Sequence, residues 1–241
     1  MKRRTVLIGL AGLPLSACAS IDPTVLEGIL GGSDGLAGLS AAEVALGLRT
    51  ALDNGVGNAL LNLGQVNGFL GNPTVRIPLP AALQDVQSVL SSVGAGGILN
   101  ELETQLNRGA EAAIPLARDI FLNAVSGLTI TDAFEILRGH DTAATDYLQG
   151  RTSTQLSAAF SPILEGALED TGALRLVQEV ENSLRNLPFI AGLGADARQD
   201  LIGHGVDFAL DGLFHFIGEE EKAIRENPAK RTSEILRRVF G

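Results

Sequence analysis

The chain has 241 residues and a formal net charge of −10, with 28 acidic against 18 basic side chains. Such an acidic surface repels phosphate backbones, so we do not expect nucleic-acid binding, and 4% aromatic residues without tryptophan leave few platforms for stacking. The 45% hydrophobic content is enough for a core, and the single cysteine excludes a disulfide within this sequence.

The first 17 residues have the pattern of a signal peptide. A basic start, Lys2 to Arg4, is followed by an apolar stretch from Thr5 to Leu13 that is too short to cross a bilayer comfortably as a helix. Residues 15–17 read Leu-Ser-Ala directly before Cys18, which resembles the lipobox of bacterial lipoproteins. We therefore expect cleavage after residue 17 and lipidation of Cys18.

Lipidation accounts for Cys18 better than the other roles of a cysteine. A lone cysteine lacks further thiolate ligands for a metal, and a nucleophile at the end of a removable segment has no use. Loss of residues 1–17 removes three basic and no acidic side chains, which changes the formal charge from −10 to −13. The lipid would then supply the membrane attachment, and Ala19 favours the outer over the inner membrane. Sec and twin-arginine export both remain open.

Residues 18–39 are predicted to form the lipidated N-terminus and a flexible tether. Pro23 and the sequence GGSDG favour a linker. Gly31, Ser33 and Gly35 match the G-x-S-x-G pattern of a hydrolase nucleophile, but that motif needs a strand-to-helix turn, and no strand is predicted around it. We interpret the pattern as part of the linker.

Residues 40–241 are predicted to form a single all-α domain with several helices. Ser40 with Glu43 makes a capping box, and Gly127, Gly139 and Gly150 are placed as helix stops. We expect Thr152 with Gln155 to open a new helix. The predicted helices cover residues 40–63, 80–93, 97–113, 115–126, 130–138, 142–149, 152–171 with a bend near Pro162, 173–186, 196–226 and 228–240.

One proline-rich segment, NPTVRIPLP at residues 72–80, cannot be a regular helix. Val75, Ile77 and Leu79 alternate with Thr74 and Arg76, which predicts an extended segment with one apolar face. We expect it to lie over the helices as a strap. An edge that pairs with a partner strand or peptide is the alternative.

His204, Asp211 and His215 share one side of the helix 196–226, at spacings of seven and four residues. They could contribute metal ligands, yet one helix supplies too few. The opposite side is apolar, so we expect the histidines to face water and predict no metal site and no cofactor. The apolar side consists of Ile202, Val206, Leu210, Leu213 and Ile217.

Asn107, Arg108 and Glu111 form the one polar cluster that we single out. They share the polar side of the helix 97–113, opposite Leu99, Leu102 and Leu106, and could line a cleft if another helix covers them. Glu221 and Arg225 are interpreted instead as an i,i+4 pair on a helix surface. No residue is assigned a catalytic role.

Four segments carry a family resemblance: GLRTALDNGV from Gly47, GFLGNPTVRIPLP from Gly68, LNRGAEAAIPLARDIF from Leu106 and ALDGLFHFIGEEEKAIRENPAKRT from Ala209. With them the chain resembles the bacterial domain-of-unknown-function family DUF4197, over residues 47–241. The resemblance implies an exported or lipid-anchored helical protein. The family has no established activity, so no site residue is carried over.

The sequence therefore favours a lipid-anchored, periplasm-facing helical protein without catalytic activity, which serves as an interaction or structural module of the cell envelope. Its expected partners are the membrane, through Cys18, and another envelope protein. Two alternatives stay open. One is a carrier of an apolar ligand such as a lipid in a helical cavity, and the other is an enzyme that uses the polar cluster.

Overall fold

The computed structural model describes residues 39–92, 97–170 and 197–240, and within them the fold is all-α with no strand, as the sequence predicted. The predicted signal peptide, the predicted tether up to residue 38 and the predicted helix 173–186 lie outside the described residues. The described helices belong to one domain. Their bounds are α2 Ala41–Leu63, α3 Ala81–Ser92, α4 Gly97–Ala113, α5 Ala117–Ser126, α6 Ile130–Arg138, α7 Ala143–Asp170, α9 Ala197–Glu226 and α10 Glu234–Phe240, with single 3₁₀ turns at Ile114–Leu116 and Pro228–Lys230.

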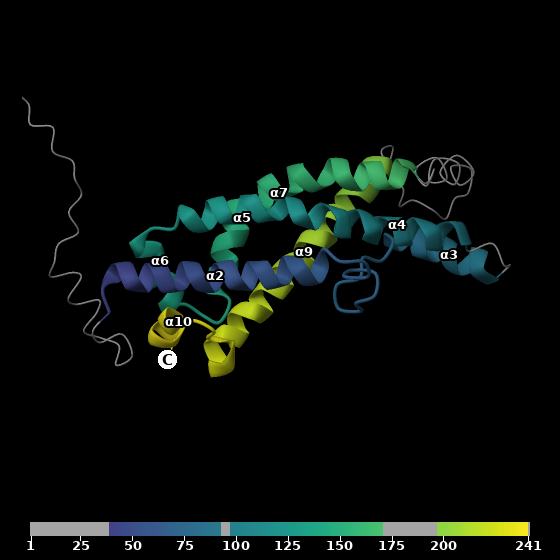
Figure 1. Ribbon diagram of the computed structural model, residues 1–241. Helices are drawn as coiled ribbons and strands as arrows, with labels where there is room; N and C mark the ends of the chain where they lie inside the picture. The colour runs from purple at the N-terminus through teal and green to yellow at the C-terminus, as the bar shows by residue number, and fades with distance from the viewer. Residues whose placement is uncertain (1–38, 93–96, 171–196, 241) are drawn as a thin grey trace, which may run out of the picture.

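The helices form an elongated bundle in which α9 is the central member (Figure 1). α9 crosses α2 on its way along the molecule and packs on both α2 and α7. α4 and α5 follow one another along α7, and α7 also contacts α6 and α9. α3 packs on α4 at one end, while α6 and α10 lie against α2 at the other.

Local capping sets the beginnings of two helices. The hydroxyl of Ser40 accepts the Glu43 amide at 3.2 Å, and the Glu43 carboxylate accepts the Ser40 amide at 2.8 Å, which confirms the predicted capping box of α2. Thr129 and Asp132 form the same reciprocal pair at the start of α6. These bonds satisfy amide groups that the first helical turn leaves without partners.

The predicted helix stop at Gly150 is wrong, because α7 runs unbroken from Ala143 to Asp170 through both Gly150 and Pro162. The predicted start at Thr152 is wrong for the same reason, since its hydroxyl donates to the Leu148 carbonyl inside the helix. The apolar face of α7 continues past Gly150, and burial of that face outweighs the weak helix propensity of one glycine. The fully buried members of this face are Leu148, Leu156, Phe160, Leu164 and Leu168.

The last helix, α10, is shorter than the predicted helix 228–240. Asn227 caps only the 3₁₀ turn, where its side chain accepts the Ala229 amide at 3.0 Å, and α10 begins later, at Glu234. α10 lies close against α2 because Gly47 has no side chain. A Cβ at Gly47 would stand 2.5 Å from the Cγ2 of Val239.

We call the segment 72–80 the strap. Residues 73–75 form a turn, and the chain has no regular structure from Arg76 to Pro80. Ile77 and Leu79 are at most 1% exposed, so full burial of each contributes about 1.5–3 kcal/mol. At the start of the strap, Val75 approaches α9 at Gly212, where a Cβ would lie 3.0 Å from that of Val75. The glycine permits this close contact.

No single helix in the described part of the chain has both the length and the apolar character needed to cross a membrane. Leu99–Ser126 and Ile130–Arg138 meet these criteria only as a pair, bent by 103°.

Candidate functional site

The predicted polar cluster lies under the strap. Asn107 is fully buried, and its side-chain oxygen accepts the Ile77 amide at 2.9 Å while its nitrogen donates to the Ile77 carbonyl at 2.8 Å. The same nitrogen donates to the Glu103 carbonyl within α4. Asn107 thus pairs with the strap backbone as a neighbouring strand would, and it uses all of its donors in doing so.

Glu111 holds the turn that precedes the strap. It is only 4% exposed, and one carboxylate oxygen accepts the amides of Phe69 and Leu70, both at 3.1 Å. Its other oxygen forms a 2.6 Å ion pair with Arg108, whose second nitrogen donates to the Asn67 side chain. Asn67 has φ 71°, a left-handed conformation that asparagine tolerates better than most residues, and the bond from Arg108 helps to hold it.

The structure therefore brings Asn107, Arg108 and Glu111 together, but on a covered side of α4 rather than on a polar surface. No helix covers Asn107 and Glu111: the strap binds Asn107, and the turn before the strap binds Glu111. Both side chains are buried rather than open to a cleft. Their bonds go to backbone groups of residues 69–77. This arrangement can hold the turn and the strap in place. The side-chain groups that make these bonds are then occupied by the backbone and are not open to a ligand.

His204, Asp211 and His215 do not form one site. The Nε2 of His204 donates to the Pro78 carbonyl at 2.7 Å, and its ring lies 4.4 Å from that of Phe208, so the prediction that it faces water was wrong. Asp211 and His215 are exposed. Among the residues that the structure describes, no group of three or more His, Cys, Asp or Glu side chains is placed to hold a metal ion.

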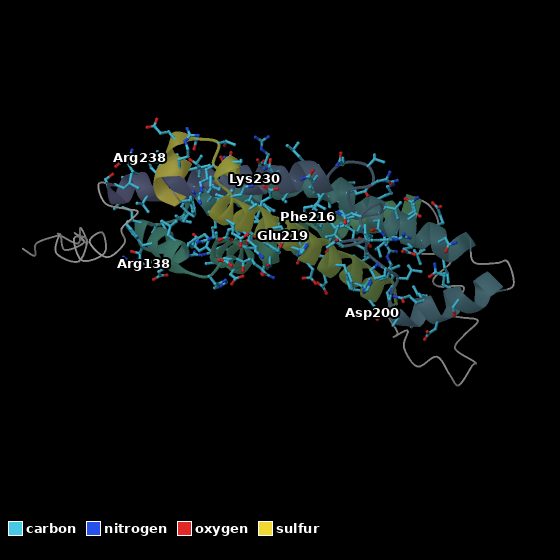
Figure 2. All side chains as sticks on the ribbon, turned by 90° about the horizontal axis from the view of Figure 1, so that it is seen from below. Arg138, Asp200, Phe216, Glu219, Lys230 and Arg238 are labelled. Carbon is cyan, nitrogen blue, oxygen red and sulfur yellow. The ribbon has the colours of Figure 1, made fainter. Side chains whose placement is uncertain are left out.

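Asp211 and His215 instead line an open polar pocket of about 290 Å³ between the start of α7 and the middle of α9. Asp146 from α7 and Glu219 from α9 add carboxylates, and Figure 2 shows Glu219 midway between the two ends of the molecule. Asp146 also pairs with His140 at 3.1 Å, both side chains being exposed. An open pocket with several carboxylates attracts cations weakly, because exposed charges are screened by salt.

Glu221 and Arg225 form a buried network, so their interpretation as a surface pair was wrong. Glu221 is 9% exposed and accepts the amides of Ala144 and Thr145 at 3.0 and 2.8 Å, together with the Thr145 hydroxyl at 2.8 Å. Arg225 pairs with Glu221 at 2.9 Å and donates to the Ile136 carbonyl, also at 2.9 Å. One ion pair on α9 thus caps the start of α7 and the end of α6.

The sequence does contain a signal for this burial. Glu221 follows Ile217 by four residues and precedes Ile224 by three, which places it in the apolar register of α9. A charged residue in that register needs a partner and acceptors inside the protein.

A groove between α2 and α5 has a volume of about 800 Å³. The residues from α2 recur at helical spacing and so belong to one face of that helix. Leu61 is 76% exposed and Leu122 on the facing helix 38%, although both are large and apolar. The groove is lined by Asp53, Val56, Gly57, Leu60, Leu61, Gly64 and Gln65 from α2 and the turn after it, and by Pro115, Arg118 and Leu122.

Two further exposed apolar side chains neighbour the groove in sequence: Val66, 74% exposed, follows Gln65, and Leu116, 45% exposed, follows Pro115. Sequence analysis did not single out this surface. The signal was present in α2, where Leu60 and Leu61 both follow the predicted core position Val56, so the apolar side chains extend around the helix.

A smaller pocket inside the bundle, lined by Leu52, Ile217 and Phe240 among others, has a volume of about 20 Å³. That is room for about one water molecule.

These features define an all-α protein of one described domain, in which Asn107, Glu111 and Glu221 are bonded to backbone groups and an apolar groove lies on the surface. The family model described as "Protein of unknown function (DUF4197)" matches residues 38–241, and the chain belongs to this family. No curated protein and no solved structure matches the chain.

Proposed function

We propose that the protein is a non-catalytic interaction module of the bacterial cell envelope, lipid-anchored through Cys18 and facing the periplasm, with the outer membrane favoured over the inner. It binds another envelope protein in the groove between α2 and α5. The proposed anchor is supported by the basic and apolar residues at the start of the sequence and by Leu15, Ser16 and Ala17 before the cysteine.

The exposed apolar groove is the observation that carries the proposed interaction. Apolar side chains gathered in one hollow mark binding surfaces more reliably than single exposed leucines do. Leu61 and Leu122 belong to a hollow of about 800 Å³ with Asp53 and Arg118 among its lining residues. An apolar centre with charged residues beside it is the usual composition of a protein interface.

The alternatives have less support. The carrier was predicted to hold its ligand in a cavity between the helices, and the pocket inside the described bundle holds about 20 Å³, far less than the roughly 300 Å³ or more that is usual for a ligand pocket. An enzyme that used Asn107 and Glu111 would have to release them from the backbone groups that they bind.

The anchor is tested by mass spectrometry of the N-terminal peptide of the protein purified from membranes. We expect Cys18 to be the first residue and to carry acyl chains, and the variant Cys18→Ala to be recovered without them from the soluble fraction. An uncleaved N-terminus, or membrane retention of Cys18→Ala to the same extent, would refute the anchor.

The interaction is tested by a photoreactive amino acid placed at Leu61 in the full chain, in its native envelope. Leu46 provides the matched control, because it is a leucine of the same helix that is 56% exposed and does not line the groove. We expect position 61 to yield one discrete adduct with another protein and position 46 to yield none. Equal labelling at both positions, or no adduct at 61, would refute the groove as the binding surface.

A further inference from the structure

The groove contains a notch at Gly57. A Cβ at this position would have no atom within 4 Å, although the residue lies in the middle of α2, between Asp53 and Leu61 on the lining face. A helix surface that lacks a side chain between larger neighbours forms a hole, into which a bulky side chain of a second helix can insert. The shape of the groove therefore favours a convex occupant with one large apolar side chain opposite Gly57.

The length of the groove suits a short helix. Its lining residues on α2 and the following turn run from Asp53 to Gln65, which corresponds to about 18 Å at the rise of an α-helix. Three turns of a partner helix cover that length. The apolar face of an amphipathic helix presents side chains at the spacing of such a groove.

The charges favour an overall basic partner rather than a second copy of this chain. The sequence has a formal net charge of −10, so two copies repel one another, whereas a basic helix is attracted. Asp53 lies on the α2 wall of the groove and Arg118 on the α5 wall. An occupant with a basic residue facing Asp53 and an acidic residue facing Arg118 would therefore be favoured.

We infer that the groove binds an overall basic amphipathic helix of another protein, about three turns long, with a bulky apolar side chain seated at Gly57. This inference rests on the proposed interaction at the groove and adds the kind of partner to it.

The test uses the full chain in its native envelope with the photoreactive residue at Leu122, on the wall opposite Gly57. The variant Gly57→Leu fills the notch, and because leucine has a higher helix propensity than glycine, the fold is kept. Gly150→Leu is the matched control, since Gly150 also lies within a helix with no atom within 4 Å of a Cβ, on α7 and outside the groove. We expect Gly57→Leu to lower the adduct yield roughly tenfold or more and Gly150→Leu to leave it unchanged.

Sequencing of the cross-linked peptide identifies the occupant. The inference is supported if the peptide comes from a basic amphipathic helix and if Arg118→Glu lowers the yield while Arg151→Glu, on α7 and outside the groove, does not. It is overturned if Gly57→Leu leaves the yield unchanged, or if the peptide is extended or acidic, comes from a second copy, or comes from the same chain. If position 61 gives no adduct in the unsubstituted protein, the proposed function itself fails, which is a different outcome.

Discussion

Removal of the Glu221 carboxylate is expected to destabilise the protein strongly. This group connects α9 to the start of α7 directly and to the end of α6 through Arg225. In Glu221→Ala the amides of Ala144 and Thr145 lose their acceptor, and loss of a helix cap costs about 1 kcal/mol. Arg225, whose side chain is 14% exposed, loses its counter-charge, and breaking a buried pair costs about 3–5 kcal/mol. Arg225 keeps its bond to the Ile136 carbonyl, so we expect the broken pair to cost the lower value, about 3 kcal/mol, and the lost cap to bring the total to about 4 kcal/mol.

The measurement is urea unfolding of the purified protein, followed by circular dichroism. In a thermal scan of the same protein, a loss of about 4 kcal/mol corresponds to a fall in the thermal midpoint of roughly 8–16 °C for a domain of this size. Glu219→Ala is the control, since this exposed neighbour should change the free energy of unfolding by no more than about 0.5 kcal/mol. Equal effects of the two substitutions would mean that the network does not stabilise the fold as its geometry indicates.

Three further predictions concern single residues. Asn107→Ala should cost about 2–3 kcal/mol and speed hydrogen exchange of the Ile77 amide, because the strap loses its paired backbone partner, and an unchanged exchange rate would contradict this. The Ser40 amide and hydroxyl bond the Glu43 carboxylate and lower its pKa below the usual 4.5, so its contribution is present above that pH and is lost as the pH falls through the lowered pKa. Glu43→Gln should therefore flatten the fall in thermal midpoint below about pH 4.5, and an unaltered slope would argue against the cap. Gly150→Ala should raise the free energy of unfolding by up to about 1 kcal/mol in the same urea assay, and a loss would show that the glycine is required in α7.

Where local chemistry decides, the sequence predicted the structure well. The side chains of Ser40 and Glu43 are close in sequence and need no other element to cap α2. In the strap, Val75, Ile77 and Leu79 are all buried, although residues 73–75 form a turn and not the extended backbone that the alternation predicted.

The predictions from sequence were wrong where the local structure depends on contacts with a distant part of the chain. A glycine such as Gly150 often ends a helix, but the burial of Leu148 and Phe160 on either side of it stabilises a continuous α7. Glu221 and Arg225 have the spacing of a surface pair, and only the ends of α6 and α7, some 80 residues away, make them a buried network. Asn107, Arg108 and Glu111 do lie together, but the segment that binds them, residues 67–77, could not be inferred from the helix that carries them.

The buried polar groups contribute to the stability of the fold, whereas the exposed side chains of the groove contribute little to it. Asn107, Glu111 and Glu221 are bonded to backbone groups, so their burial is explained by folding. Leu61, at 76% exposed, contributes little to the core, and Leu61→Gln should change the free energy of unfolding by no more than about 0.5 kcal/mol. The same substitution should abolish the adduct from position 122, because an amide in the apolar centre of an interface loses its water without gaining a partner. Loss of both the stability and the adduct would instead mean that Leu61 belongs to the core, and the groove would then need no partner.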